Sequence, residues 1–303
     1  PEPHPADSVY LMAYFKAGSQ HLFYAYSRDG KTWTDLNGTR PVFAAYDNGI
    51  WLRDPYLQRV TRNGKSRFHL VHTWGWDHPA IFHWESDDLI HWTAANGSTR
   101  TEDGKVMLMD GSKGGPQSPN AWAPEFTYDE TADIFYLYWS SRIGDRQVHH
   151  YCTTRDWLEF STPAVYFDPG FTAIDMTILK AGGTYYAYYK DERNGEKTIR
   201  CATSKSLDPN VQRFEGDTPI LPSRYIEVEG PEVFPALGGK SWFLYFDKFN
   251  GDRGTSFARC ADPSRHQWYP VPDGEIRNPT DVKHGSVVII SEKELERLQE
   301  HYR

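Results

Sequence analysis

Five copies of a strand–turn–strand unit are the feature that most restricts how this chain can fold. Each copy has an aromatic-rich strand, a short turn and a second strand that ends near Ser or Cys. The first strands of the copies are Tyr10–Phe15, Arg67–His72, Ile134–Trp139, Thr184–Tyr189 and Ser241–Phe246. Because each unit must bury its apolar faces against its neighbours, radial repetition of this kind predicts an all-β, five-bladed β-propeller.

A further short strand precedes copies two to five but not copy one. These strands are Arg53–Gln58, Ala123–Tyr128, Ile174–Leu179 and Glu229–Phe234. The segment His284–Ile290, near the C-terminus, can supply the missing strand of the first copy. That pairing would close the ring and remove two exposed sheet edges. We therefore expect a single domain over residues 1–303, with a short amphipathic helix at about 291–302.

The composition supports a β-rich fold and disfavours some classes of partner. Aromatic residues make up 15% of the chain, which suits pleated sheets and also the stacking of sugar rings. The net charge of −8 argues against binding to nucleic acid or to an anionic membrane surface. No apolar run approaches the length of a transmembrane helix. The chain begins at Pro1 without a methionine, so we expect a mature or trimmed product.

The three cysteines fit a structural role. Cys152, Cys201 and Cys260 fall near the same point of the second strand in three successive copies. Equivalent positions in different blades are too far apart for a disulfide, and the spacing is not that of a metal site. We expect all three to pack as small apolar side chains between blades.

In a propeller the first strand of each blade lines the central channel, and in this chain all five such strands begin with an ionisable residue. In ring order these residues are His284, Asp54, Glu125, Asp175 and Glu229. Charged groups gathered at a channel mouth are costly unless they are paired or act chemically. Any one of them could simply satisfy backbone donors at a strand end, but a whole ring favours a catalytic site.

The ring order suggests different chemistry for three of these carboxyl groups. Asp175 and Glu229 lie on adjacent blades, so the charge of one should raise the pKa of the other and keep a proton available. Asp54 lies two blades from Glu229. On a regular pentagon that separation is about 1.6 times the adjacent one, which leaves room for the water that an inverting glycosidase requires.

At these positions the sequence resembles glycoside hydrolase family 43. The matching segments, which span nearly the whole chain in the expected order, are Arg53-Asp54-Pro55, Trp122-Ala-Pro-Glu125, Ile174-Asp175-Met-Thr-Ile-Leu179, Glu229-Gly230-Pro231 and Lys283-His284-Gly285. The resemblance implies a single catalytic propeller domain and an inverting mechanism. It makes Asp54 the general base, Glu229 the general acid, and Asp175 the residue that tunes and orients Glu229. Lys283 departs from the pattern, because close relatives often carry arginine there, and Glu125 is expected to be structural.

The same resemblance implies that no cofactor is required. His284 matches a channel histidine that, in some relatives, lies beside a bound calcium ion or a water cluster. Calcium prefers oxygen ligands, so a lone histidine is a poor ligand by its own chemistry. No residue is assigned as a metal ligand, and a structural calcium near His284 stays open.

Tryptophan and arginine residues near the expected channel mouth are candidates for binding sugar. The substrate-binding candidates are Trp74, Trp122, Arg142, Arg253 and His284, with Trp51, Trp76 and Trp139 near the same strand ends. Either arginine could instead form a surface ion pair. Trp33 and Trp92 lie in Asp-rich turns and are expected in the core.

Three other interpretations stay open, and the first is a different propeller hydrolase, either a sialidase or an invertase-like enzyme. Ser27–Trp33 has the turn seen in sialidases, but no arginine cluster with a tyrosine nucleophile accompanies it. The triplet Arg53-Asp54-Pro55 also occurs in invertase-like enzymes, which retain configuration and need an aspartate nucleophile on the first blade. A non-catalytic carbohydrate-binding propeller would repeat equivalent pockets in every blade. A protein-interaction scaffold would have no need of carboxylates concentrated in its channel.

The expected substrate is an oligosaccharide or polysaccharide of the plant type. Ala121–Phe126 and His284–Val287 look most like segments of bacterial exo-acting members that work on arabinose-containing or galactan side chains. This favours an exo-acting α-L-arabinofuranosidase. The alternatives within the family are β-xylosidase, endo-arabinanase, β-galactosidase and galactofuranosidase. We expect a bacterial protein that is secreted or periplasmic.

Overall fold

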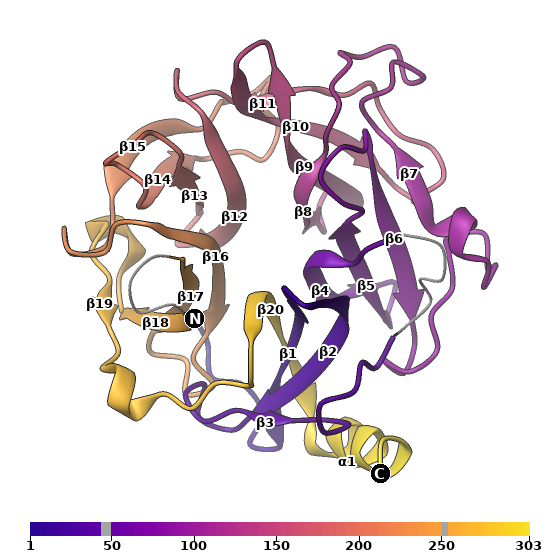
Figure 1. Cartoon of the computed structure of the whole chain (residues 1–303), viewed down its shortest axis with the longest axis vertical. Helices are drawn as coiled ribbons and strands as arrows, with labels where there is room; N and C mark the ends of the chain where they lie inside the picture. The colour runs from indigo at the N-terminus through magenta and orange to yellow at the C-terminus, as the bar shows by residue number, and fades with distance from the viewer. Residues whose placement is uncertain (44–49, 250–253) are drawn as a thin grey trace.

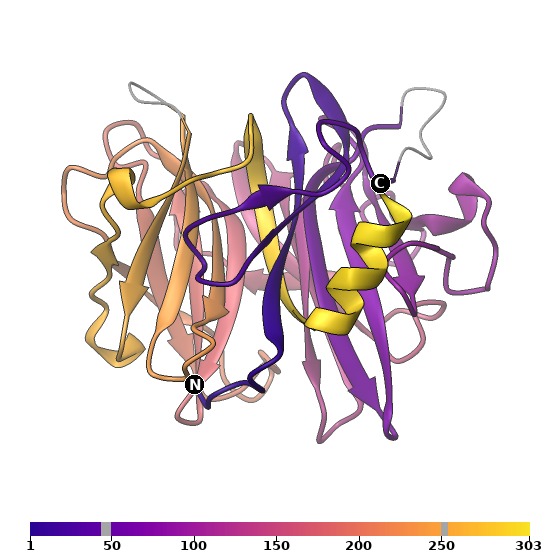
Figure 2. The same cartoon turned by 90° about the horizontal axis from the view of Figure 1, so that it is seen from below.

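The chain folds into a ring of five sheets around a central channel. A computed structural model describes residues 1–43, 50–249 and 254–303. Each sheet has four antiparallel strands, and the sheets are arranged radially like the blades of a propeller (Figure 1). Seen from the side, the strands run between the two faces of the ring (Figure 2). The predicted all-β, five-bladed β-propeller is confirmed.

Each blade has one strand at the channel and three that follow it outward. From the channel outward, blade one contains β20 (Val282–Ser291), β1 (Ser8–Lys16), β2 (Ser19–Ser27) and β3 (Thr34–Asp35). Blade two contains β4 (Arg53–Arg62), β5 (Lys65–Thr73), β6 (Ala80–Ser86) and β7 (Lys105–Met107). Blade three contains β8 (Trp122–Asp129), β9 (Ile134–Ile143), β10 (Arg146–Thr154) and β11 (Ala164–Phe167).

The remaining two blades follow the same plan. Blade four contains β12 (Ala173–Ala181), β13 (Thr184–Asp191), β14 (Ile199–Ser204) and β15 (Glu215–Pro219). Blade five contains β16 (Val228–Pro235), β17 (Trp242–Lys248), β18 (Gly254–Cys260) and β19 (Tyr269–Pro270). Short 3₁₀ turns lie in the connections at Thr101–Gly104, Pro263–Arg265 and Asp273–Glu275.

The first blade joins the two ends of the chain. β20 pairs antiparallel with β1, so that Ile290 lies opposite Val9 and Val288 lies opposite Leu11. The C-terminal strand therefore occupies the channel side of the N-terminal blade, as the sequence predicted (Figure 1). This pairing satisfies the backbone groups of both strands that an open ring would leave exposed.

A single α-helix follows β20 within the described part of the chain. Helix α1 (Glu292–His301) lies on the outside of the ring, and Ser291 and Glu294 form a capping box at its start (Figure 2). Leu295 and Leu298 are buried in the core between blades one and two. These bounds agree with the predicted helix at about 291–302. No helix in the described ranges has the length and apolar character needed to cross a membrane.

The hydrophobic core is divided into layers between neighbouring blades. Because successive side chains of a strand point to opposite faces, the two faces of β1 pack against different neighbours. Leu11 belongs to the layer shared with blade two, whereas Tyr10 and Met12 belong to the layer shared with blade five. Both faces of the sheet are thus buried, which explains why strands such as β1 are almost continuously apolar.

The cysteines and the predicted core tryptophans lie in these layers. Cys152, Cys201 and Cys260 are buried and unpaired, as the sequence indicated. Trp33 and Trp92 are also buried. The turn before Trp33 is structural, because Asp29 Oδ1 accepts hydrogen bonds from the backbone N–H groups of the next residues. Equivalent aspartate turns occur in blades two and three, which supports an architectural rather than a sialidase-specific role.

All five channel strands carry a β-bulge at the same level. Their pairing registers shift near the start of β4, β8, β12 and β16, and in β20 opposite Ala13–Phe15. The residues at this level have positive φ, and they are Asp54, Ala123, Asp175, Gly230 and His284. A bulge redirects side chains and is strained for residues other than glycine. The five bulges set which side chains face one end of the channel.

Candidate active site

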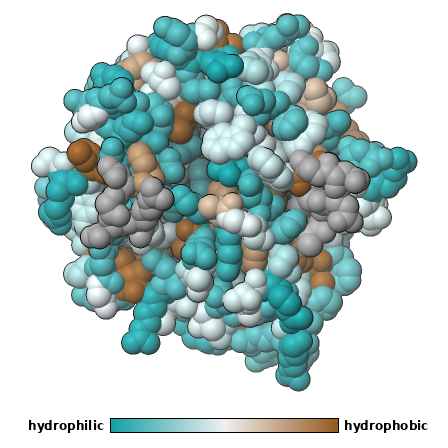
Figure 3. Space-filling view, viewed as in Figure 1, coloured by the Kyte–Doolittle hydropathy of each residue, from teal (hydrophilic) through white to brown (hydrophobic). Residues whose placement is uncertain are grey.

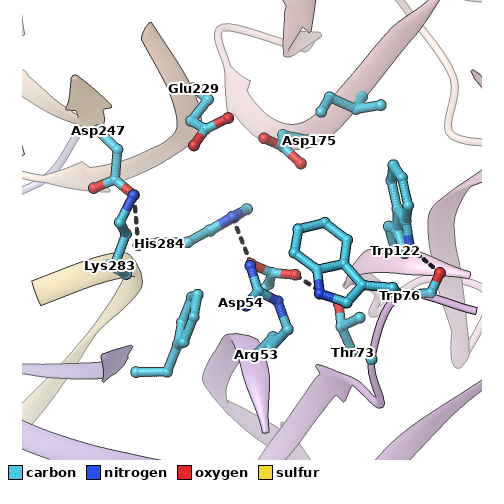
Figure 4. Close-up of a pocket in the computed structure, with 13 residues that line it drawn as sticks. Arg53, Asp54, Thr73, Trp76, Trp122, Asp175, Glu229, Asp247, Lys283 and His284 are labelled. Carbon is cyan, nitrogen blue, oxygen red and sulfur yellow. Dashed lines mark hydrogen bonds and ion pairs between the residues drawn. The ribbon is translucent and has the colours of Figure 1, made fainter. Parts of the chain in front are cut away.

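One pocket opens at the bulged end of the channel. It is lined by residues from all five channel strands, and the carboxyl groups of Asp54, Asp175 and Glu229 reach it from three different directions (Figure 4). In the view along the channel axis, hydrophilic residues surround the hollow near the centre of the molecule (Figure 3). The structure therefore brings the three predicted catalytic residues into one pocket, together with His284.

Asp54 is held as a carboxylate by a neighbouring cation. The His284 ring lies 3.1 Å from Asp54 through Nδ1 and Oδ1, and the Thr73 hydroxyl donates a 2.8 Å hydrogen bond to Oδ2. Burial opposes the charge on Asp54, but His284, Arg53 and Thr73 outweigh it and lower its pKa to about 2. Asp54 is therefore ionised at neutral pH, as a general base must be.

His284 completes this ion pair as an imidazolium. Burial disfavours its charge, yet Asp54, Asp175 and Asp247 raise its pKa to about 10. The backbone N–H of His284 donates to Asp247 Oδ2 at 2.8 Å, which fixes the bulge of β20. Glycine suits position 230 beside the ring, because its φ is +59° and a Cβ there would lie only 3.0 Å from His284 Cγ.

Asp175 has a different electrostatic environment from Asp54. Its Oδ2 accepts a 3.0 Å hydrogen bond from the backbone N–H of Gly230 on the adjacent blade. Burial, together with the charges of Glu229 and Asp54, raises the pKa of Asp175 to about 7. The sequence predicted that Asp175 and Glu229 would interact across adjacent blades. The raised pKa lies on Asp175, which can therefore hold a proton close to neutral pH.

Glu229 is the most exposed of the three carboxyl groups. Its side chain is 30% accessible, whereas that of Asp54 is 14% accessible. Glu229 Oε2 lies 3.0 Å from the Nζ atom of Lys190, which is on the second strand of blade four. Glu229 lies one residue before the bulge at Gly230, so its side chain reaches the pocket from the rim.

Glu125 does not belong to this ring of residues, and the expectation that all five ionisable residues share one level was wrong. The bulge of β8 places Ala123 at the level of Asp54, so Glu125 lies two residues deeper. There it meets Glu232 of β16, which accepts a hydrogen bond from Thr177. Both glutamates are fully buried and neither lines the pocket. All five strands share the bulge, so the difference arises because Glu125 follows the bulge residue Ala123 by two positions in the sequence.

The predicted sugar-binding residues are only partly brought together. Trp122 and His284 line the pocket, and so does Trp76, whose indole lies across the view between Asp54 and Trp122 (Figure 4). Trp74 instead stacks on His78 with ring centroids 3.7 Å apart and does not line the pocket. Arg142 is exposed away from the pocket, where its backbone N–H bonds Asn120. Neither Trp74 nor Arg142 lines this pocket, and their contact with sugar stays a prediction.

The other candidates lie elsewhere or beyond the described residues. Trp139 is buried with its indole N–H bonded to Ser141, and Trp51 is exposed but does not line the pocket. Trp139 was expected at the channel mouth, but its strand turns it into the layer between blades two and three. Arg253 lies outside the described residues.

Some residues in the pocket or against it were not selected from the sequence. Thr73, Lys190 and Asp247 each lie at or near the end of the second strand of a blade, directly after an apolar run. That strand is antiparallel to the channel strand, so its end returns to the pocket side of the ring. A polar residue that ends an aromatic strand was therefore the signal that could have identified them.

The His284 ring is engaged by protein groups, because its Nδ1 lies 3.1 Å from Asp54 Oδ1. Calcium prefers oxygen ligands, and a structural calcium near His284 stays a prediction. Within the described ranges, one group of three potential ligands comprises His69, His83 and Glu85, whose ligand atoms all lie within 4.8 Å of one another.

That histidine cluster is already engaged by protein groups. His69 Nδ1 and His83 Nε2 are 3.0 Å apart, and Arg67 forms an ion pair with Glu85. Trp157 stacks on the His83 ring with centroids 3.8 Å apart. These contacts fit an inter-blade packing role for the cluster, in which the histidines behave as flat, neutral side chains.

Several solved structures of glycoside hydrolases have a fold similar to that of this chain. A propeller with a carboxylate-lined channel mouth is an architecture found in glycoside hydrolases, and solved structures of this class match the chain. They include an endo-1,4-β-xylanase from Bacteroides thetaiotaomicron, with a TM-score of 0.62 and 16% identity over 88% of this chain and 94% of that chain. A family-43 β-1,3-galactosidase gives a TM-score of 0.62 and 13% identity over 88% of this chain and 56% of that chain. At these identities the likeness shows the fold alone.

The family model of family-43-related glycosyl hydrolases, described as "Probable glycosyl hydrolase domain", matches residues 6–296. The chain belongs to this family and is a glycoside hydrolase. It is also 28% identical over 181 residues to an α-L-arabinofuranosidase from Bifidobacterium longum subsp. longum. That match covers 50% of this chain and 16% of the relative, so the chain corresponds to a small part of that protein.

Proposed function

We propose that this glycoside hydrolase is an inverting, exo-acting α-L-arabinofuranosidase in which Asp54 is the general base and Glu229 the general acid. The observation that carries the proposal is the contrast in charge within one pocket. Asp54 is paired with the His284 cation, whereas Asp175 holds a proton near neutral pH beside Glu229. One side of the pocket can thus accept a proton while the other side supplies one.

The arrangement of the channel strands supports the inverting mechanism. Around the ring, β20 lies between β4 and β16, so His284 separates Asp54 from Glu229. The sugar would lie between the two carboxyl groups. Asp54 removes a proton from a water molecule while the oxygen of that water forms a bond to the anomeric carbon. Glu229 protonates the glycosidic oxygen as the bond from that oxygen to the anomeric carbon breaks. Asp175, whose pKa is raised to about 7, holds a proton beside Glu229.

The closed base of the pocket supports exo action. Beneath Asp54, Asp175 and His284, the channel strands bring Glu125 and Glu232 together, and both are buried. Their burial is consistent with a pocket that is closed on its inner side. At the rim, Trp76 is 53% exposed and lies edge-to-face with Trp122, with centroids 5.9 Å apart. A blind pocket with an aromatic rim suits a terminal sugar that stacks on a ring.

Arabinofuranose is the preferred sugar because the curated relative that matches half of this chain is named for that activity. The test is a panel of 4-nitrophenyl α-L-arabinofuranoside, β-D-xyloside, β-D-galactoside and β-D-galactofuranoside, followed by arabinan. We expect the arabinofuranoside to be cleaved with the highest kcat/KM. Fastest cleavage of another glycoside would replace the sugar assignment. Inertness towards the whole panel and arabinan would favour a carbohydrate-binding propeller.

The stereochemistry can be measured independently of the sugar. Proton NMR of fresh product should show the anomer opposite to that of the substrate before mutarotation. Retention of configuration would overturn the roles of Asp54 and Glu229, because it requires a carboxylate nucleophile.

We further propose that residues 1–303 form one catalytic domain and that the protein works outside the cytoplasm, either secreted or in the periplasm of a bacterium. A polysaccharide side chain is too large to cross a membrane unaided, and this supports the location. Fractionation of the producing cells, followed by immunoblotting, tests it. Recovery of the protein only in the cytoplasm would overturn the proposal.

A further inference from the structure

Lys190 is a buried cation that has no role in the mechanism proposed for the carboxyl groups. It lies near the end of β13, and its side chain is only 4% exposed. Its Nζ atom lies 3.0 Å from Glu229 Oε2 and also forms an ion pair with Glu192. The ring of Phe249 lies under the same ammonium, with its centroid 4.3 Å from Nζ. An ammonium at this depth is costly unless such partners compensate for its lost hydration.

The groups around Lys190 keep it charged. Burial alone would lower the pKa of Lys190, but Glu229, Asp175 and Glu192 raise it above its ordinary value. The partners are unequal in position. Glu229 and Asp175 line the pocket, whereas Glu192 lies just after the end of β13 and outside the pocket lining. Lys190 therefore carries a permanent positive charge against the pocket side of blade four.

The contact with Lys190 distinguishes the two oxygens of Glu229. Because the ammonium donates to Oε2, that oxygen is engaged as an acceptor. A proton on Glu229 is then carried by Oε1. When the proton passes to the glycosidic oxygen, Glu229 gains a full negative charge while the anomeric C–O bond breaks. A cation 3.0 Å away stabilises that charge as it develops, which is the condition for an electrostatic contribution to the rate.

We propose that Lys190 is a positioning residue that directs the protonated oxygen of Glu229 towards the leaving group and stabilises the carboxylate that forms. This inference rests on the proposed general-acid role of Glu229. A purely structural lysine would be satisfied by Glu192 and Phe249 alone. The additional contact with a pocket carboxyl group is what assigns Lys190 to the reaction.

Lys190→Met tests this role because it removes the charge but keeps an unbranched apolar chain. The matched control is Lys180→Met, since Lys180 is an exposed lysine of the neighbouring strand β12 whose Nζ lies 5.3 Å from the Tyr185 ring. The substrates are the 4-nitrophenyl and methyl glycosides of the sugar that the panel identifies. The 4-nitrophenolate leaves with little help from an acid, whereas methoxide must be protonated.

For Lys190→Met we expect kcat/KM on the methyl glycoside to fall by about 10- to 100-fold, and on the 4-nitrophenyl glycoside by less than about threefold. Lys180→Met should leave both values unchanged. Lys190→Arg keeps the charge and should recover much of the methyl-glycoside activity.

Equal losses on both glycosides would overturn the proposal, because they would indicate a structural role. If Lys190→Met does not fold, Lys190→Gln provides the same comparison. Glu229→Gln separates the role of Lys190 from that of the general acid. If Glu229→Gln loses only the methyl-glycoside activity and Lys190→Met keeps full activity, the role of Lys190 is rejected and the general acid is retained. Full activity of Glu229→Gln on both glycosides rejects the general acid itself.

Discussion

Two levels of the same channel hold carboxyl groups in opposite electrostatic environments. At the pocket, Asp54 has a cationic partner in His284 and its pKa is lowered to about 2. Two residues deeper along the channel strands, Glu125 and Glu232 have mainly each other. Burial raises the pKa of Glu232 to about 8 and that of Glu125 well above its ordinary value. Strand position alone therefore does not give a carboxyl group its role, which depends on the nearest cation and on access to the pocket.

Removal of the pocket carboxylate should have the largest effect on activity. Asp54→Asn keeps the shape but cannot accept a proton, so kcat/KM should fall by about 10²- to 10⁴-fold. Circular dichroism should show an unchanged fold. Asp87→Asn, an exposed substitution on the same blade, is the control and should retain full activity. Near-normal hydrolysis by Asp54→Asn would remove the general base from the mechanism.

Removing the cation at the pocket should make Asp54 resemble the deeper carboxyl groups. Without His284, burial is less opposed and the pKa of Asp54 should rise by about 1–2 units. Since the base must be ionised, the acid limb of kcat/KM in His284→Gln should move to higher pH. Activity should therefore be lost as pH falls, with the largest relative loss in the acid range. A pH profile that only scales down, without a shift of this limb, would contradict the ion-pair argument.

The aromatic rim should affect binding more than chemistry. Trp76→Ala removes an exposed indole that lines the pocket, and KM should increase by about 3- to 10-fold with little change in kcat. Trp51→Ala is the matched control, because Trp51 is 41% exposed yet outside the pocket lining. Equal effects of the two substitutions would show that Trp76 has no special contact with the sugar.

The deeper pair should affect stability rather than activity. In Glu232→Gln, an amide replaces a carboxyl group that holds its proton up to about pH 8, so kcat/KM should stay within about twofold at pH 7. A carboxyl group with a raised pKa contributes stability that is fully present below its unfolded pKa, near 4.5, and is lost as pH rises through about 8.

From pH 5 to pH 8, the thermal midpoint should therefore decrease more in the native protein than in Glu232→Gln. The difference between the two decreases should be a few degrees. Differential scanning calorimetry at both pH values measures this difference. Identical pH dependence of the two proteins would mean that the pair is ionised in the folded state, as the pocket carboxylate is.

The repeat pattern was sufficient to predict the architecture. A strand such as Thr184–Tyr189 can be predicted from its local sequence alone, and this sequence contains five strands of that kind. The missing strand of the first copy and its replacement by His284–Ile290 could also be read directly, because strand pairing depends on period-2 patterning. The motifs at Asp54, Asp175 and Glu229 predicted which carboxyl groups share the pocket.

What the sequence could not decide is the level of each side chain and its partners. Ala123 lies at the level of Asp54, and Glu125 lies two residues deeper. An offset of two residues keeps a side chain on the same face of the strand, so the alternating pattern does not reveal it. The ion pairs of Asp54 with His284 and of Glu229 with Lys190 join residues 230 and 39 positions apart. Charge states in the pocket depend on these long-range contacts and on burial, so only the tertiary structure determined which carboxyl groups are ionised and which hold a proton.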